Sequence, residues 1–258
     1  MATAKLQVTG AIDIDPIRRE RLYVNVVGRT PLILNRLSEK VMHELLMPRG
    51  RKNSAEKATS LKHDPLAEFR SSPNRIAEDD APTLLALPAT AFKGALRTSA
   101  LDVPGITKSA LGRNSFIEGE LIGIYGVPQI LLSAVRSSDV ARTPDIRSRC
   151  IVPHWCASFT VDFSLGVITE KSIVNLLANA GMTVGVGDWR PEKGSGTFGQ
   201  FDVGVASDDE AFLHIQSTGG RAVQVAAMDA PEPYNDETQE LLSWFGAEVN
   251  RRGFKVAA

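Results

Sequence analysis

The chain has 258 residues and a formal net charge of −1, and 43% of its residues are hydrophobic while 23% are charged. These are the proportions of an ordinary soluble globular protein. Two cysteines, Cys150 and Cys156, are too few for a disulfide framework, and the longest apolar region, 121–135, is too short and too interrupted to span a bilayer. We therefore expect a cytoplasmic protein with reduced thiols and no membrane partner.

Charge is distributed unevenly along the chain. Residues 36–62 contain seven Lys or Arg against three Glu, and residues 93–113 contain four against one Asp. Residues 207–258 contain four cations against nine carboxylates. A basic front with an acidic tail can attract phosphates locally although the total charge is near zero.

The first third of the chain predicts a strand, a short helix and a long loop. Residues 22–27 are rich in β-formers, and a turn at 28–31 follows them. Residues 37–46 have a helical pattern. Residues 47–82 are rich in Arg, Lys, Ser and Asn with little apolar period, which predicts a basic insertion loop.

The middle third predicts a strand at 83–87 and a helix at 91–100 that Thr90 caps. A pair of strands is expected next, at 116–125 and 129–135.

The last third begins with one long predicted strand, 149–163. A helix from Thr169 to Gly181 follows, and it leads into a segment with five glycines, 185–199, which we call the glycine loop. A strand is expected at 198–205, and two more helices at 209–216 and 236–250.

This order of elements predicts an α+β fold. It is compatible with a ferredoxin-like (RRM-like) β-α-β-β-α-β core that carries insertions. We expect residues 1–206 to form this domain and residues 207–258 to form an acidic helical extension.

Two segments combine backbone and cationic groups in a way that suits phosphate. Lys93 and Arg97 lie four residues apart, on one face of a helix near its N-terminus. In the glycine loop, Arg190 and Lys193 add charge where glycines let main-chain amides approach an anion, and Trp189 offers a face for base stacking. The alternatives are a solvated helix face and a Trp that packs under its own loop.

Residues 87–97, LPATAFKGALR, resemble the I-P-G-S-S-L-K-G-A-L-R segment of the RAMP superfamily of CRISPR-associated proteins. The glycine loop resembles the C-terminal glycine-rich loop of the same superfamily, and the two segments occur in the order that the superfamily has. The resemblance implies a ferredoxin-like fold. It is closest to the backbone subunits that line up along a guide RNA, and a phage or mobile-element relative would share it.

From the charge pattern and the resemblance together we expect nucleic-acid contacts at sixteen residues: Arg29, Asn35, Arg36, Arg51, Lys52, Thr90, Phe92, Lys93, Arg97, Arg147, Arg149, Gly185, Gly187, Trp189, Arg190 and Lys193. The basic loop is as compatible with a solubilising role as with one that closes over a bound strand.

The sequence does not favour catalysis or a cofactor. The resemblance implies that subunits which cut RNA use an Asp after the first strand, and residues 28–63 contain none. No phosphate-binding G-x-x-x-x-G-K motif occurs, and Cys150, His154 and Cys156 lack a fourth zinc ligand. We expect no metal and no catalytic residue. His43 and His63 leave open a metal-independent endoribonuclease.

The expected function is therefore binding of single-stranded RNA, or single-stranded DNA, without cleavage, through phosphates and 2′-hydroxyls. Copies of the chain would assemble head-to-tail, alone or with other subunits of a ribonucleoprotein complex. The alternative to both binding and cleavage is a structural or adaptor protein of phage origin.

Overall fold

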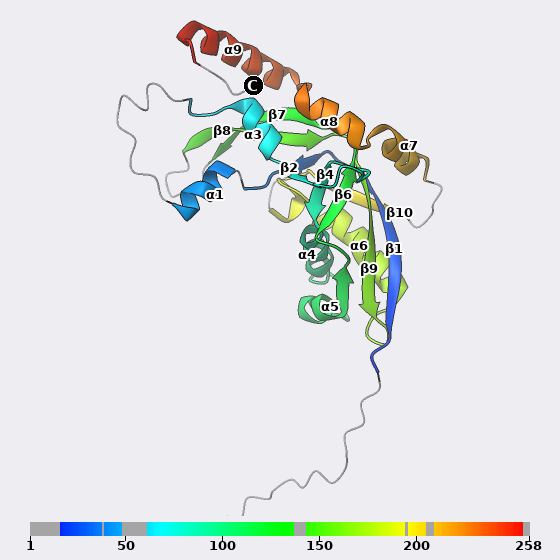
Figure 1. The fold of residues 1–258 in the computed structure, drawn as a ribbon. Coiled ribbons are helices and arrows are strands. Elements are labelled where there is room, and N and C mark those ends of the chain that lie inside the picture. Colours follow the sequence, from blue (N-terminus) through cyan, green and yellow to red (C-terminus); the bar gives the residue numbers. More distant parts are fainter. Residues whose placement is uncertain are drawn as a thin grey trace, which may run out of the picture.

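The computed structural model describes residues 16–37, 39–47, 61–136, 143–193, 196–204 and 209–254. Within these ranges the strands form two antiparallel sheets (Figure 1). The large sheet has the order β10 (Phe201–Gly204), β1 (Arg19–Gly28), β9 (Cys156–Ser164), β6 (Leu121–Tyr125), β4 (Leu85–Pro88), β3 (Asn74–Arg75), and β5 (Ser115–Ile117) also pairs with β9. The small sheet has the order β2 (Leu32–Leu34), β8 (Pro144–Val152), β7 (Gln129–Arg136).

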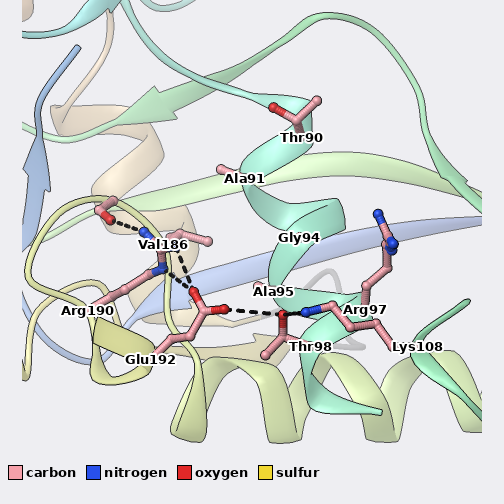
Figure 2. A pocket seen from close by; sticks show the side chains of 11 residues that line it. Thr90, Ala91, Gly94, Ala95, Arg97, Thr98, Lys108, Val186, Arg190 and Glu192 are labelled. Carbon is pink, nitrogen blue, oxygen red and sulfur yellow. Dashed lines mark hydrogen bonds and ion pairs between the residues drawn. The ribbon is translucent and has the colours of Figure 1, made fainter. Parts of the chain in front are cut away.

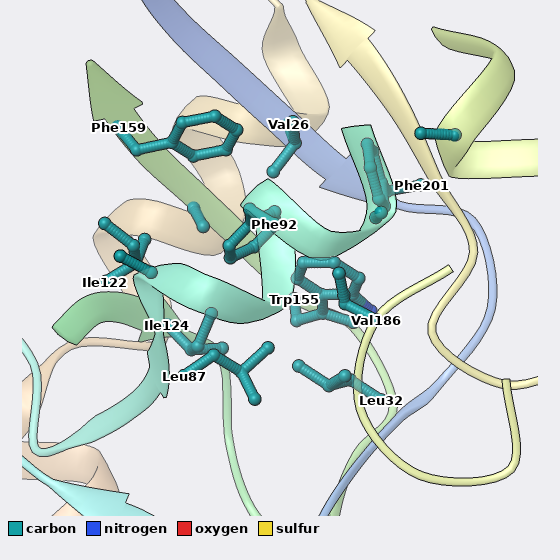
Figure 3. Packing of buried hydrophobic residues seen from close by; sticks show 14 of the residues in the cluster. Val26, Leu32, Leu87, Phe92, Ile122, Ile124, Trp155, Phe159, Val186 and Phe201 are labelled. Carbon is teal, nitrogen blue, oxygen red and sulfur yellow. The ribbon is translucent and has the colours of Figure 1, made fainter. Parts of the chain in front are cut away.

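Two helices cover one face of the large sheet, namely α4 (Ala89–Ser99) and α6 (Glu170–Thr183). The side-chain period of two along β1 explains this, because Val24 and Val26 are buried against the helices while Tyr23 is exposed on the other face. Figure 3 shows Phe92 of α4 among Phe159, Phe201 and Trp155, and the ring centroids of Phe92 and Phe159 are 4.6 Å apart. The core therefore joins both helices to the sheet.

The mixed α+β class predicted from the sequence is confirmed. The predicted strand 149–163 is wrong as a single element, since the chain leaves the small sheet after β8 and enters the large sheet with β9. Pro153 interrupts the strand at this corner, and Trp155 is fully buried there, with its indole N–H donating to the Thr30 carbonyl at 2.9 Å. β6 and β7, expected as a pair, also lie in different sheets.

The predicted helices are present with shifted ends. α1 spans Glu39–Leu46, and α6 begins after Thr169, whose side chain accepts from the Ser172 N–H at 3.2 Å. α4 begins at Ala89 because Pro88 occupies the cap position, so the prediction that Thr90 caps this helix is wrong. Three short helices were not predicted: α3 (Pro65–Ser71), α5 (Lys108–Asn114) and α8 (Arg221–Asp229). The prediction of a loop over 47–82 is therefore wrong at α3 and at β3, which both lie within it.

The C-terminal helices α7 (Glu210–Thr218), α8 and α9 (Asp236–Arg252) lie along the end of the molecule that carries the small sheet (Figure 1). Buried polar side chains join them to the strands. The Thr238 hydroxyl accepts from the Leu132 N–H of β7 at 3.2 Å, and Gln224 of α8 is fully buried. Across the described ranges, no helix has the length and apolar character needed to cross a membrane.

Candidate nucleic-acid interface

α4 and the glycine loop face each other across one cavity of about 300 Å³ (Figure 2). The two segments are about ninety residues apart in the sequence, and α5 contributes a further side chain. The lining residues are Thr90, Ala91, Gly94, Ala95, Arg97, Thr98, Lys108, Val186, Gly187, Arg190 and Glu192.

The wall formed by α4 is smooth because small residues recur at helical spacing. Ala91, Gly94 and Ala95 face the cavity, while Phe92 and Leu96 on the other side of the helix are fully buried. The first turn of α4 carries no acidic side chain. The N-terminal part of this wall is therefore free of negative charge.

The opposite wall is a loop held close to β2. The Asp188 N–H donates to the Ile33 carbonyl at 3.0 Å. At Gly187, φ is +80° and a Cβ would lie 2.6 Å from that same carbonyl oxygen, so this position requires glycine. A single 3₁₀ turn, η1 (Pro191–Lys193), then presents Glu192 to the cavity.

A chain of hydrogen bonds crosses the cavity (Figure 2). Arg190 donates from Nε and Nη2 to Oε2 of Glu192 at 3.0 and 2.6 Å, and from Nη1 to the Gly187 carbonyl at 3.0 Å. The Thr98 hydroxyl donates to Oε1 of Glu192 at 3.3 Å and accepts from Nζ of Lys108 at 3.0 Å.

Glu192 remains ionised in this setting. Burial opposes its charge, but the hydrogen bond from Arg190, the charges of Arg190 and Lys193 and the hydroxyl of Thr98 outweigh that effect. The pKa of Glu192 consequently lies below its ordinary value.

Within the described residues, neither Arg97 nor Lys108 forms a salt bridge at the cavity, and Arg97 also lacks a hydrogen-bond partner at its buried Nε. A buried donor without an acceptor is costly, and this nitrogen lies against Gly112 of α5, where a Cβ would come within 2.4 Å of it. With Lys108, Arg97 makes one edge of the cavity cationic.

Four of the sixteen predicted residues line the cavity together: Thr90, Arg97, Gly187 and Arg190. Phe92 is fully buried in the core, so the prediction that it contacts a ligand is wrong. Lys93 lies elsewhere, because its Nζ is 4.5 Å from the centroid of the Phe116 ring.

A separate cluster surrounds Asp188 and holds the glycine loop in place. It consists of Arg149, Trp189 and Asn35. The Arg149 side chain is 7% exposed, and its guanidinium carbon lies 4.9 Å from the centroid of the Trp189 ring. Oδ2 of Asp188 lies 3.4 Å from Nη1 of Arg149 and accepts from Nδ2 of Asn35 at 2.9 Å. Burial lowers the pKa of Arg149 despite the opposing charge of Asp188.

The prediction that Arg149 contacts nucleic acid is wrong, because its side chain is too deeply buried to reach a nucleic-acid backbone. The Trp189 ring is half-buried against Ile33, Leu131 and Ile151, which is the packing alternative that the sequence left open.

The remaining predicted residues do not line the cavity. Arg29 is exposed near Asp202, Arg147 is exposed near Asp145, and the exposed Lys193 ends η1. Gly185 is buried and its N–H donates to the Ala180 carbonyl at the end of α6. Arg36 is half-buried at the end of the segment after β2. Arg51 and Lys52 lie outside the described residues.

Neither His43 nor His63 lines this cavity. Both ring nitrogens of His63 face carboxylates, Glu68 at 2.6 Å and Asp145 at 2.9 Å, and His43 is an exposed residue of α1. In the ranges that the structure covers, no three His, Cys, Asp or Glu side chains form a metal-binding group. Cys150 and Cys156 are buried free thiols.

Among the polar and charged residues that line the cavity, sequence reasoning missed three: Thr98, Lys108 and Glu192. Lys108 lies within the basic segment 93–113, and Glu192 lies between two cations of the glycine loop. The position of Glu192 between Arg190 and Lys193 was the available signal, because a carboxylate between two cations of a short loop indicates an ion pair.

Comparison with known proteins gives little. No family model matches the chain, and no curated protein matches it. Among solved structures it is similar to Cmr6 from Pyrococcus furiosus, with a TM-score of 0.36 and 10% sequence identity, over 72% of this chain and 98% of that chain. A TM-score this low does not establish a shared fold.

Proposed function

We propose that the chain binds single-stranded RNA without cutting it, as a subunit of a guide-RNA complex in the RAMP superfamily. One observation carries the proposal: the two segments that resemble RAMP motifs, 87–97 and 185–199, line one cavity with a cationic edge. Their sequence separation makes this meeting informative, because only the fold brings helix α4 and the glycine loop together.

The strand order is consistent with the same proposal. β10, β1, β9 and β6 lie side by side in an antiparallel sheet, with α4 and α6 on one face. This is the order in which a ferredoxin-like β-α-β-β-α-β core arranges its four strands. We propose that this core underlies the large sheet and that the remaining strands are insertions.

The proposal is tested through the dependence of binding on salt. Phosphate contacts release counterions, so affinity for a short labelled oligouridylate should fall steeply as salt rises. Arg97→Gln and Lys108→Gln should each reduce the slope of log K against log salt by about one unit. Arg252→Gln, on α9 far from α4, removes the same charge and should leave the slope unchanged. Absence of binding, or equal slopes in all variants, would overturn the proposal.

Assembly along the strand is a second part of the proposal. The candidates for contact between copies are large apolar side chains that stay exposed on two separate helices, Leu45 and Leu46 on α1 and Trp244 on α9. Light scattering should then find more copies on a long RNA than on a short one. One copy on RNA of any length would remove this part.

A further inference from the structure

The cavity between α4 and the glycine loop is not purely cationic, because it contains the carboxylate of Glu192. A carboxylate repels phosphate, so its presence weakens a site that only needs to hold a polyanion. The role of Glu192 therefore depends on which hydrogen bonds each of its two carboxylate oxygens can still accept.

The two oxygens differ in what they already accept. Oε2 takes both donors of Arg190, at 3.0 and 2.6 Å. Within the described residues, Oε1 accepts a single long bond of 3.3 Å from the Thr98 hydroxyl. Each carboxylate oxygen has two acceptor sites, so Oε1 keeps the capacity for a further donor.

Glu192 lines the cavity with a partly exposed side chain. The Glu192 side chain is 29% exposed, and Figure 2 shows its carboxylate directed toward Thr98 of the opposite wall. Arg190 holds the carboxylate in this orientation from the other side. Because the pKa of Glu192 is lowered, the group is ionised at neutral pH and can only accept.

The surroundings of Oε1 indicate which donor fits. One hydroxyl, that of Thr98, separates Oε1 from the ammonium of Lys108. A ligand that places a phosphate on Lys108 therefore brings its directly attached sugar near Oε1, whereas its base edge lies farther from the phosphate. In RNA, that sugar carries a 2′-hydroxyl, which is a donor that DNA lacks.

We propose that Glu192 accepts a hydrogen bond from a ribose 2′-hydroxyl of the bound strand, and that this contact makes the cavity select RNA over DNA. The inference rests on the proposed function, since it requires a strand held by Arg97 and Lys108. Arg190 is a positioning residue in this arrangement: it orients the carboxylate without touching the ribose.

The experiment compares the affinities of the full chain for oligomers with identical uracil bases: oligouridylate, oligodeoxyuridylate and 2′-O-methyl oligouridylate. A hydrogen bond to a charged group corresponds to a roughly tenfold preference for RNA over DNA. The 2′-O-methyl strand keeps the oxygen but loses the donor, so it should bind as weakly as DNA.

Variants assign the preference to Glu192. Glu192→Ala should abolish the RNA preference, and Glu192→Gln should reduce it, because an amide oxygen accepts less strongly than a carboxylate. Neither variant should weaken DNA binding, since removing a negative charge favours phosphate. Glu237→Gln, an exposed carboxylate on α9, is the control that removes an equal charge without changing the ratio.

Three outcomes would overturn the inference. Equal affinity of the natural chain for RNA and DNA leaves nothing for Glu192 to discriminate. If Glu192→Gln raises the affinities for RNA and DNA equally, Glu192 acts only by electrostatic repulsion of phosphate. If the natural chain prefers guanine-containing strands and Glu192→Gln loses that preference, Oε1 contacts a base edge and not the ribose. Failure of all oligomers to bind removes the proposed function as well, which separates that case from the others.

Discussion

Asp188 makes four contacts that together hold the glycine loop in its position. Its N–H donates to the Ile33 carbonyl, and its Oδ1 accepts from the Trp189 N–H at 3.0 Å. Its Oδ2 accepts from Asn35 and lies near Arg149. The carboxylate of Asp188, paired with the buried guanidinium of Arg149, thus holds the loop that presents Arg190 to the cavity.

Replacing this carboxylate should loosen the loop. Asp188→Ala leaves Arg149 buried without its counter-charge, so we expect a loss of about 2–3 kcal/mol in the free energy of unfolding. Trp189 should become more exposed and its fluorescence should shift to longer wavelength. Urea denaturation followed by fluorescence, in a Trp244→Phe background that removes an exposed indole, measures both effects.

The matched control replaces both partners. Arg149→Met combined with Asp188→Ala should be less destabilised than Asp188→Ala alone, because the double variant leaves no unpaired buried charge. A double variant whose loss equals the sum of the two single losses would contradict this account.

The same cluster explains why several site residues could not be assigned from the sequence. Arg149 and Trp189 combine a cation with an aromatic ring, and that pair of residue types serves ligand stacking and internal packing equally well. Only burial separates the two roles, and burial here depends on how β8 passes under the glycine loop. Arg97 lines the cavity while Phe92 and Lys93 of the same motif do not, because a motif does not fix which way each side chain of a helix points.

Helix α4 has two faces with different requirements. One buries Phe92 and Leu96 in the core, and the other gives the cavity a wall of small side chains. Gly94 is in the middle of the second face, and a Cβ placed there would meet no atom within 4 Å. The helix itself would favour alanine at this position, so glycine there suits the cavity better than it suits the helix.

We expect Gly94→Ala to stabilise the protein by about 0.5–1 kcal/mol, because alanine has the higher helix propensity. Its methyl group would enter the cavity and weaken RNA binding. Thermal denaturation and RNA titration measure the two effects, and their opposite signs distinguish this outcome from general misfolding.

Gly181→Ala is the contrasting substitution in α6. A Cβ at Gly181 would overlap the carbonyl oxygen of Phe201 in β10, so this glycine permits the helix and the strand to touch. We expect a loss of at least about 1–3 kcal/mol from overpacking against a rigid backbone. An unchanged melting temperature would contradict the close packing of α6 on β10.

Local signals placed most helices well and some strands poorly. The α4 prediction missed the first residue by two positions, because Pro88 and not Thr90 precedes the helix. Residues 149–163 contain β-formers on both sides of Pro153, and this proline is the local signal that the chain changes sheets there. Pairing between strands is a tertiary property, and local sequence reports it weakly.

The acidic extension expected at 207–258 raises the question of whether the C-terminal helices fold independently. The sequence indicates a boundary near residue 206 because the last expected strand of the core ends there and carboxylates outnumber cations after it, and that point lies outside the described residues. The contacts of α8 point to joint folding, since Met228 is buried in the main core. Charge composition describes the surface of a segment and does not report what its apolar side packs against.

Gln224 provides the sharpest test of joint folding. This side chain is fully buried in α8, and its Oε1 accepts from the N–H groups of Leu84 and Leu85 at 2.7 and 3.1 Å. Its Nε2 donates to the carbonyls of Ile124 and Gly126 at 2.7 and 3.1 Å. One amide therefore joins α8 to the chain around β4 and β6.

We expect Gln224→Ala to lower the free energy of unfolding by about 2–4 kcal/mol, because it leaves buried backbone groups without partners. Gln239→Ala, on the exposed side of α9, should change it by less than about 0.5 kcal/mol. Unfolding of the Gln224 variant should remain one cooperative transition, since sheet and helices share the lost contacts. Two separate transitions, with the sheet melting at the unchanged temperature, would instead establish residues 207–258 as an independent unit and restore the boundary that the charge pattern indicates.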